Sequence, residues 1–240
     1  MSASAAVPRT MPEAYAARLR ANAGDPLVTF YDLATGERVE LSATTWVNWA
    51  AKVAGLLTDE LDLERGARLR IDLGAHWQAG VLLGGAWWAG IETVGPDAPG
   101  SVDATACAEA DVERHQDGGA VLALSLKPMS GPCGPLPPGV LDFGREVLAM
   151  PDAYAPLDPP EPSDAAWTEA GSAATQADLL ASPSADRVLT DAPPAGALGA
   201  RLLGGALAGS GSLVLVRRRG GEVPASLPEQ ERVTRTALAG

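Results

Sequence analysis

The fold of this chain is decided by the stretch RLRIDLGAHWQAGVLLGGAWWAGIETVGP, residues 68–96. Residues 68–73 alternate between polar and apolar side chains as a β-strand does, and residues 91–95 form a second short strand that ends at Pro96. Residues 76–89, between them, are apolar and long enough for a helix. A strand, a helix and a strand in this order predict a parallel sheet, and therefore a layered α/β fold with helices flanking the sheet.

The predicted central helix contains Gly80, Gly84 and Gly85. Each glycine weakens a helix by about 1 kcal/mol, so three of them predict that the helix backbone packs closely against a sheet. The apolar run from Ala79 to Ile91 is shorter than the ~20 residues that cross a bilayer. A longer apolar run over 195–216 is interrupted by Arg201 and is expected to be a buried helix and strand.

The residues before this unit predict a helix over 11–23, two short strands over 27–31 and 38–41, and a second helix that Ser42 caps. Trp46 and Trp49 begin an apolar stripe at helical spacing in the second helix. Such a stripe is typical of a core face, and we expect Trp49 in particular to lie in the core.

The residues after it predict a strand over 120–126, a short strand over 165–168, a loop over 169–174 and a final strand–helix–strand unit. Residues 128–162 hold ten of the twenty prolines, so they should be extended or looped, with one helix over 142–150. The predicted organisation is a first α/β subdomain (1–127), a proline-rich connector (128–162), a second α/β segment (163–219) and a flexible polar tail (220–240).

The composition excludes some classes of function. The net charge of −12 argues against nucleic-acid binding, and the first ten residues lack the apolar segment of a secretory signal, so we expect a cytoplasmic protein. Cys107 and Cys133 are separated and are expected to be reduced, non-catalytic thiols. With two histidines, His76 and His115, no zinc or other metal site is predicted, and His76 is expected to cap or pack a helix.

Two stretches resemble adenylate-forming enzymes, the superfamily of AMP-binding proteins and acyl-CoA synthetases. The first is carried by SATTW (42–46), LDLERGARLRI (61–71), WQAGVLLGGAWWAGI (77–91) and VGPD (94–97), and the second by RVLTD (187–191) and LVLV (213–216). The chain is most similar to a small actinobacterial family of AMP-binding-like proteins without an assigned activity. The resemblance implies the fold of the amino-terminal subdomains of these enzymes, without a counterpart of the carboxy-terminal domain.

In this superfamily a loop rich in Ser, Thr and Gly, ending in Pro-Lys, holds the ATP phosphates. The matching residues here are TEAGSAATQ (168–176), where Gln176 replaces the lysine, Thr175 the proline, and Ala170 and Ala173 two glycines. Glu169 adds a negative charge that would repel phosphate. The residues that could still bind the nucleotide cofactor, ATP or AMP, are Gly171, Ser172 and Thr175. No residue matches the family's later adenine-binding and magnesium-binding motifs or its catalytic lysine.

These departures favour a non-catalytic, degenerate homologue without a bound cofactor, acting by binding a small ligand or a protein partner, neither nucleic acid nor membrane. One alternative is a module that still binds AMP or an acyl-adenylate, or retains weak acyl-activating ligase activity. Another is an enzyme of unrelated chemistry, since one fold hosts many functions. An apolar face left without the rest of the superfamily fold would favour a homo-oligomer.

Overall fold

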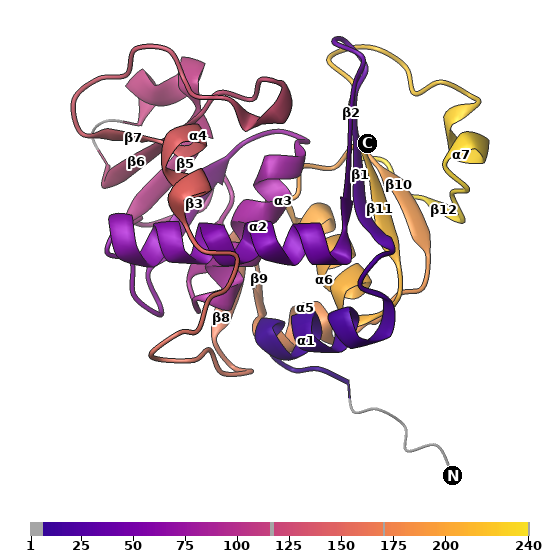
Figure 1. Ribbon diagram of the computed structural model, residues 1–240, viewed down its shortest axis with the longest axis horizontal. Helices are drawn as coiled ribbons and strands as arrows, with labels where there is room; N and C mark the ends of the chain where they lie inside the picture. The colour runs from indigo at the N-terminus through magenta and orange to yellow at the C-terminus, as the bar shows by residue number, and fades with distance from the viewer. Residues whose placement is uncertain (1–6, 116–117, 170, 240) are drawn as a thin grey trace.

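The computed structural model describes residues 7–115, 118–169 and 171–239, which form two β-sheets with helices packed between and around them (Figure 1). One sheet has five strands and the other seven. Parallel pairs predominate in both sheets, and antiparallel pairing is confined to one hairpin in each. The predicted layered α/β fold is confirmed.

The five-stranded sheet takes strands from both ends of the chain. In spatial order it contains β12 (Arg235–Thr236), β10 (Arg187–Thr190), β11 (Ser212–Arg217), β1 (Pro26–Asp32) and β2 (Glu37–Ser42). β1 lies parallel to β11, with Phe30 opposite Leu215. The residues predicted as a first subdomain and as a second α/β segment therefore share one sheet. Periodicity does not reveal this, because the paired strands are far apart in the sequence.

The seven-stranded sheet follows from the stretch that decides the fold. In spatial order it contains β7 (Val140–Asp142), β6 (Ala120–Leu124), β5 (Ala104–Ala108), β3 (Arg68–Asp72), β4 (Glu92–Val94), β8 (Ala165–Glu169) and β9 (Ser172–Thr175). β3 and β4 are parallel neighbours, as the strand–helix–strand pattern predicts. The loop predicted over 169–174 is wrong for Glu169 and for residues 172–174, which belong to the antiparallel hairpin of β8 and β9. Gly171 lies in the turn of this hairpin, and Ala170 lies outside the described residues.

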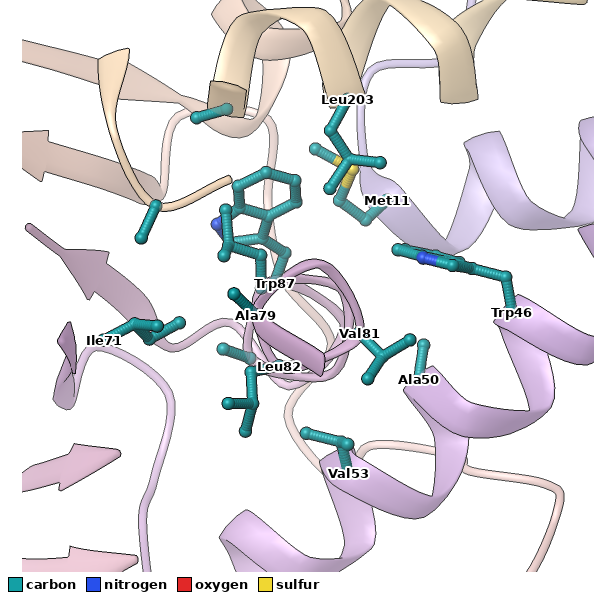
Figure 2. Packing of buried hydrophobic residues seen from close by; sticks show 14 of the residues in the cluster. Met11, Trp46, Ala50, Val53, Ile71, Ala79, Val81, Leu82, Trp87 and Leu203 are labelled. Atoms are coloured by element: carbon teal, nitrogen blue, oxygen red, sulfur yellow. The ribbon is translucent and has the colours of Figure 1, made fainter. Parts of the chain in front are cut away.

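The helix α3 (Trp77–Trp88) lies at the centre of the molecule and is buried along almost its whole length. Figure 2 shows its apolar side chains radiating in different directions, with Val81 facing the helix α2 (Ala43–Gly55) and Trp87 on another side. A Cβ on Gly84 would lie 2.3 Å from Trp46 Cη2, and one on Gly85 would lie 2.4 Å from Val53 Cγ1. The glycines therefore permit close contact with α2, and the prediction that they face a sheet is wrong for Gly84 and Gly85.

The two tryptophans of α2 differ in burial. Trp46 is fully buried, whereas Trp49 is only partly buried and packs its ring edge-on against Trp77, with the ring centroids 5.3 Å apart. The expectation that Trp49 lies in the core is therefore corrected. Helical spacing places Trp46 and Trp49 on the same face of α2, but it does not show which of them lies nearer the centre of that face. The predicted cap is confirmed, since Ser42 Oγ accepts a hydrogen bond from Thr45 N at 3.1 Å.

The proline-rich connector is mostly extended and crosses α2 (Figure 1). Its single predicted helix is divided into α4 (Phe143–Glu146) and a 3₁₀ turn over Val147–Ala149. Lys52 Nζ of α2 forms an ion pair with Asp152 Oδ1 of the connector at 2.9 Å, and Lys52 also donates to the carbonyl of Met150. The connector is therefore fastened to the helix that it crosses.

The segment after residue 220 is packed, so the expectation of a loosely held tail is corrected. Its short helix α7 (Leu227–Gln230) buries Leu227, and β12 pairs with β10. The carboxylate of Glu231 accepts hydrogen bonds from Arg38, Tyr31 and Arg187. These are contacts between distant residues, and the polar composition of the tail does not show them.

None of the helices in the described residues is long and apolar enough to cross a membrane. Within the same residues no group of three or more His, Cys, Asp or Glu side chains is placed to hold a metal ion. Cys107 and Cys133 are both buried and free, and burial raises the pKa of each thiol to about 12.

Candidate functional site

The segment that matches the phosphate loop forms the β8–β9 hairpin at one edge of the seven-stranded sheet. Two buried tryptophans hold β8 in place. Trp87 Nε1 of α3 donates to the carbonyl of Ala166 at 2.7 Å, and Trp167 Nε1 donates to the carbonyl of Ala195 at 2.7 Å, next to the helix α6 (Ala197–Ala208). The hairpin is therefore fixed between the central helix and the start of α6.

The three candidate nucleotide-binding residues occupy different positions in this hairpin. Gly171 lies in its turn with φ +78°, a left-handed conformation that favours glycine, and it is exposed. Ser172 follows at the start of β9 and pairs with Glu169 across the hairpin. Thr175 ends β9 and caps the helix α5 (Gln176–Leu180).

The hydroxyl of Thr175 is already used within the chain. Thr175 Oγ1 accepts from Asp178 N at 3.2 Å, and Asp178 Oδ2 accepts from both Thr175 N at 3.0 Å and Thr175 Oγ1 at 2.8 Å. This reciprocal arrangement is a capping box that satisfies backbone N–H groups at the start of α5. Thr175 is therefore a helix cap, and the carboxylate of Asp178 beside it is unfavourable for a phosphate.

Gln176, the residue that replaces the lysine, is fully buried. Its Oε1 accepts from Met11 N at 2.8 Å, at the first residue of the helix α1 (Met11–Asn22). Its Nε2 donates to the carbonyl of Trp87 at 2.7 Å, near the end of α3. The side chain thus points into the core, where it joins α1, α3 and α5. It is the partner of the Met11 N–H, and it is a second donor, beside Gly90 N, to the Trp87 carbonyl.

Glu169 reaches from the end of β8 to the start of α6. A Cβ on Gly95 would lie 2.8 Å from Glu169 Oε1, so the carboxylate crosses directly over this glycine. Glu169 Oε2 accepts from Ala197 N at 3.3 Å, and the N-cap residue Gly196 has no side chain to do so. A carboxylate is favourable at a helix N-terminus because of the helix dipole, and here the chain supplies that anion itself.

The residues of the hairpin therefore do not fit the ATP phosphates. The position of the lysine holds a buried amide, and a carboxylate occupies the helix N-terminus beside the turn. No lysine lies within residues 168–176. A negative charge at this point raises the cost of binding a second anion, since like charges repel at short range.

The histidines provide no acid–base pair next to the hairpin. His76 is buried and caps α3, with Nδ1 accepting from Gln78 N at 3.3 Å, so the predicted capping role is confirmed. Burial, and then the neighbouring Arg217 guanidinium, lower the pKa of His76 to about 3. His115 Nε2 lies 2.9 Å from Asp72 Oδ2, at the end of β3.

Sequence reasoning missed two features of this site. The sequence places Gln176 where the resemblance implies a lysine, but it holds no signal for the hydrogen-bond partners of Gln176, Met11 and Trp87. Glu169 was expected to repel phosphate, but the sequence did not show that its carboxylate reaches Ala197 N at the start of α6.

Solved structures with this fold include acyl-CoA synthetases. The acetoacetyl-CoA synthetase from Streptomyces lividans superposes with a TM-score of 0.74 and 16% sequence identity, over 96% of this chain and 42% of the synthetase. An acyl-CoA synthetase from Brucella canis superposes with a TM-score of 0.73 and 17% identity, over 91% of this chain and 45% of the enzyme. This chain has the acyl-CoA synthetase fold. The resemblance to adenylate-forming enzymes is thereby confirmed at the level of the fold.

A curated relative has a similar length. The TIGR03089 family protein of Mycobacterium tuberculosis is 43% identical over 149 residues, which are 60% of this chain and 61% of that protein. No family model matches the sequence. The chain spans less than half of either synthetase, so it matches only part of these enzymes.

Proposed function

We propose that this chain is a non-catalytic homologue of adenylate-forming enzymes that acts by binding another molecule. The observation that carries the proposal is the role of Gln176. At the position of the superfamily's phosphate-binding lysine, this chain has a fully buried amide that hydrogen-bonds the backbone of Met11 and Trp87. A side chain committed to the core in this way cannot reach a phosphate.

Glu169 supports the same proposal independently. Its carboxylate accepts from Ala197 N at the start of α6, beside the hairpin turn. An intramolecular anion at a helix N-terminus removes the feature that most readily binds phosphate in a loop of this kind. The lost lysine and the added carboxylate act in the same direction, against a bound triphosphate.

The competing function is a module that still binds AMP or an acyl-adenylate. It is favoured only by the left-handed turn at Gly171, which is compatible with an anion-binding loop. Such a module would need the Glu169 carboxylate to move or to be protonated.

The test is thermal unfolding of the full chain with and without Mg-ATP, and with a non-hydrolysable acyl-adenylate analogue. A ligand at a hundred times its dissociation constant stabilises a fold by about 2.7 kcal/mol, which raises the unfolding midpoint of a chain of this size by about 5–10 degrees. We expect no shift with either compound. A shift with the analogue would support the binding module, and carboxylate-dependent exchange of pyrophosphate into ATP would overturn the proposal of a non-catalytic protein.

A further inference from the structure

A cavity of about 560 Å³ lies between the residues that follow α2 (58–65) and the connector (154–158). Half of its lining is apolar, and these residues are Leu63, Ala89, Tyr154, Ala155, Pro156 and Leu157. Leu63 and Ala89 are buried and form part of its wall. The cavity is therefore a surface groove whose lining is half apolar and half polar or charged.

The connector wall of this groove is held at both ends. The ring of Tyr154 packs edge-on against Trp88, with the centroids 6.0 Å apart. Arg65 forms ion pairs with Asp158 at 3.0 Å and with Asp164 at 2.7 Å. Between these attachments Leu157 is fully exposed. A single exposed leucine is ordinary on a protein surface, but this one lies on a fixed segment at the wall of a groove.

The charge of the side chains that line the groove indicates which kind of protein segment can bind in it. Asp59, Asp62 and Glu64 also line it and are exposed, and within the described residues none of the three forms an ion pair. A second copy of this chain docking here would bring the same unpaired carboxylates close together, and like charges across an interface are costly. A segment with lysine or arginine is attracted instead.

We propose that this groove is the docking site for a basic segment of another protein. An apolar side chain of that segment inserts beside Leu157 and Leu63, and flanking Lys or Arg residues face Asp59, Asp62 and Glu64. This inference rests on the proposed function as a binding protein, since it names the surface and the chemistry of the partner.

The test titrates the isotope-labelled full chain with the acetylated and amidated peptide Lys-Lys-Leu-Lys-Lys, followed by amide shifts in NMR spectra. We expect saturable shifts centred on residues 58–65 and 154–158. The peptide Lys-Lys-Ser-Lys-Lys should bind at least tenfold more weakly, because it has the charge but not the apolar side chain. The Asp59→Asn/Glu64→Gln variant should bind Lys-Lys-Leu-Lys-Lys at least tenfold more weakly.

The matched control is Glu222→Gln/Glu229→Gln, which removes the same charge from two exposed residues of the tail and should leave the affinity unchanged. The proposal is overturned if this control weakens binding as much, if the leucine and serine peptides bind equally, or if the shifts spread over the whole acidic surface. A concentration-dependent dimer that Leu157→Ser abolishes would also overturn it, in favour of a second copy. Unfolding midpoints verify that all variants fold.

The peptide titration and the nucleotide test can overturn the docking site and the proposed function independently of each other. Absence of peptide binding together with absence of ATP binding overturns the docking site and leaves the non-catalytic proposal standing. Pyrophosphate exchange into ATP overturns the proposed function whatever the peptide does.

Discussion

Gln176 shows how one buried side chain can join several elements of a fold. Its amide satisfies a donor of α1 and an acceptor of α3, two groups that no other described side chain contacts by hydrogen bonding. Leaving the N–H of Met11 buried without a partner costs about 1–3 kcal/mol. The position is therefore constrained by packing, whatever the chain binds.

We predict that Gln176→Lys lowers the free energy of unfolding by at least about 3 kcal/mol, because it removes the bond to Met11 N and places an ammonium in the core. Urea denaturation measures this. The control is Ala173→Lys, which introduces the same charge at an exposed position of the same hairpin and should change stability by less than about 0.5 kcal/mol. Equal stability of Gln176→Lys and wild type would contradict the buried bridge.

His76 is a second residue whose environment predicts a measurable effect. Its pKa in the folded protein, lowered to about 3 by burial and by Arg217, lies below the value of about 6.5 in the unfolded chain. Between these two values the unfolded chain binds the extra proton, so the stability that neutral His76 contributes is lost as the pH falls through about 6.5 towards 3.

We predict that between pH 7 and pH 5 the wild type loses about 2 kcal/mol more unfolding free energy than His76→Asn. Asparagine can still cap α3 but does not titrate in this range. Chemical denaturation at the two pH values tests the difference. Parallel losses in both proteins would show that His76 is not the group responsible.

At the scale of elements, the contact between α2 and α3 depends on glycine. The backbone of α3 lies so close to Trp46 and Val53 that Gly84 and Gly85 have no room for a Cβ. Gly80, in the same helix, differs because a Cβ there would lie 3.9 Å from Trp46 Nε1, an ordinary van der Waals distance.

We predict opposite effects of two alanine substitutions. Gly84→Ala should destabilise the protein by about 1–3 kcal/mol, because its methyl group overlaps the fully buried Trp46 ring. Gly80→Ala should be neutral or stabilise by up to about 1 kcal/mol, because alanine is the better helix former and has room there. Thermal and urea unfolding measure both, and equal effects would contradict the helix packing described here.

The β8–β9 hairpin is the element where the structure differs most from the sequence prediction. Its residues are mostly small, so neither the alternation of a strand nor the spacing of a helix is visible between 169 and 174. The pairing of β8 with β4, the bond from Trp87 Nε1 to the carbonyl of Ala166 in β8, and the bond from Trp167 Nε1 in β8 to the carbonyl of Ala195 provide the order that local sequence does not.

At the scale of the whole molecule, the two sheets are not independent domains. β1 lies beside β11, and a single apolar cluster contains Phe30 of the five-stranded sheet and Ile71 of the seven-stranded sheet, together with α3 between them. Removing either end of the chain therefore exposes the core of both sheets.

We predict that the full chain unfolds in one transition, with tryptophan fluorescence and far-UV circular dichroism giving the same midpoint. A fragment of residues 1–162 should not fold, because β1 then lacks its neighbour β11. Circular dichroism and NMR dispersion test the fragment. Two separate transitions, or a folded fragment, would contradict the shared core.

Much of the fold follows from the sequence. Periodicity correctly predicted the helices near Met11, Ser42 and His76, and the alternation of elements over 68–96 predicted a parallel α/β sheet, because these features depend on residues close together in the chain. Ser42 and His76 were also predicted as caps, since capping involves only the next few residues.

The sequence by itself determined the α/β class and the resemblance of residues 168–176 to a phosphate loop, with Gln176 at the position of its lysine. Only the tertiary structure decided that Gln176 joins three helices, that Glu169 reaches the start of α6, and that both ends of the chain share a sheet. The physical reason is that a side chain's role is set by what lies within a few ångströms of it, and in this fold those neighbours come from distant parts of the chain.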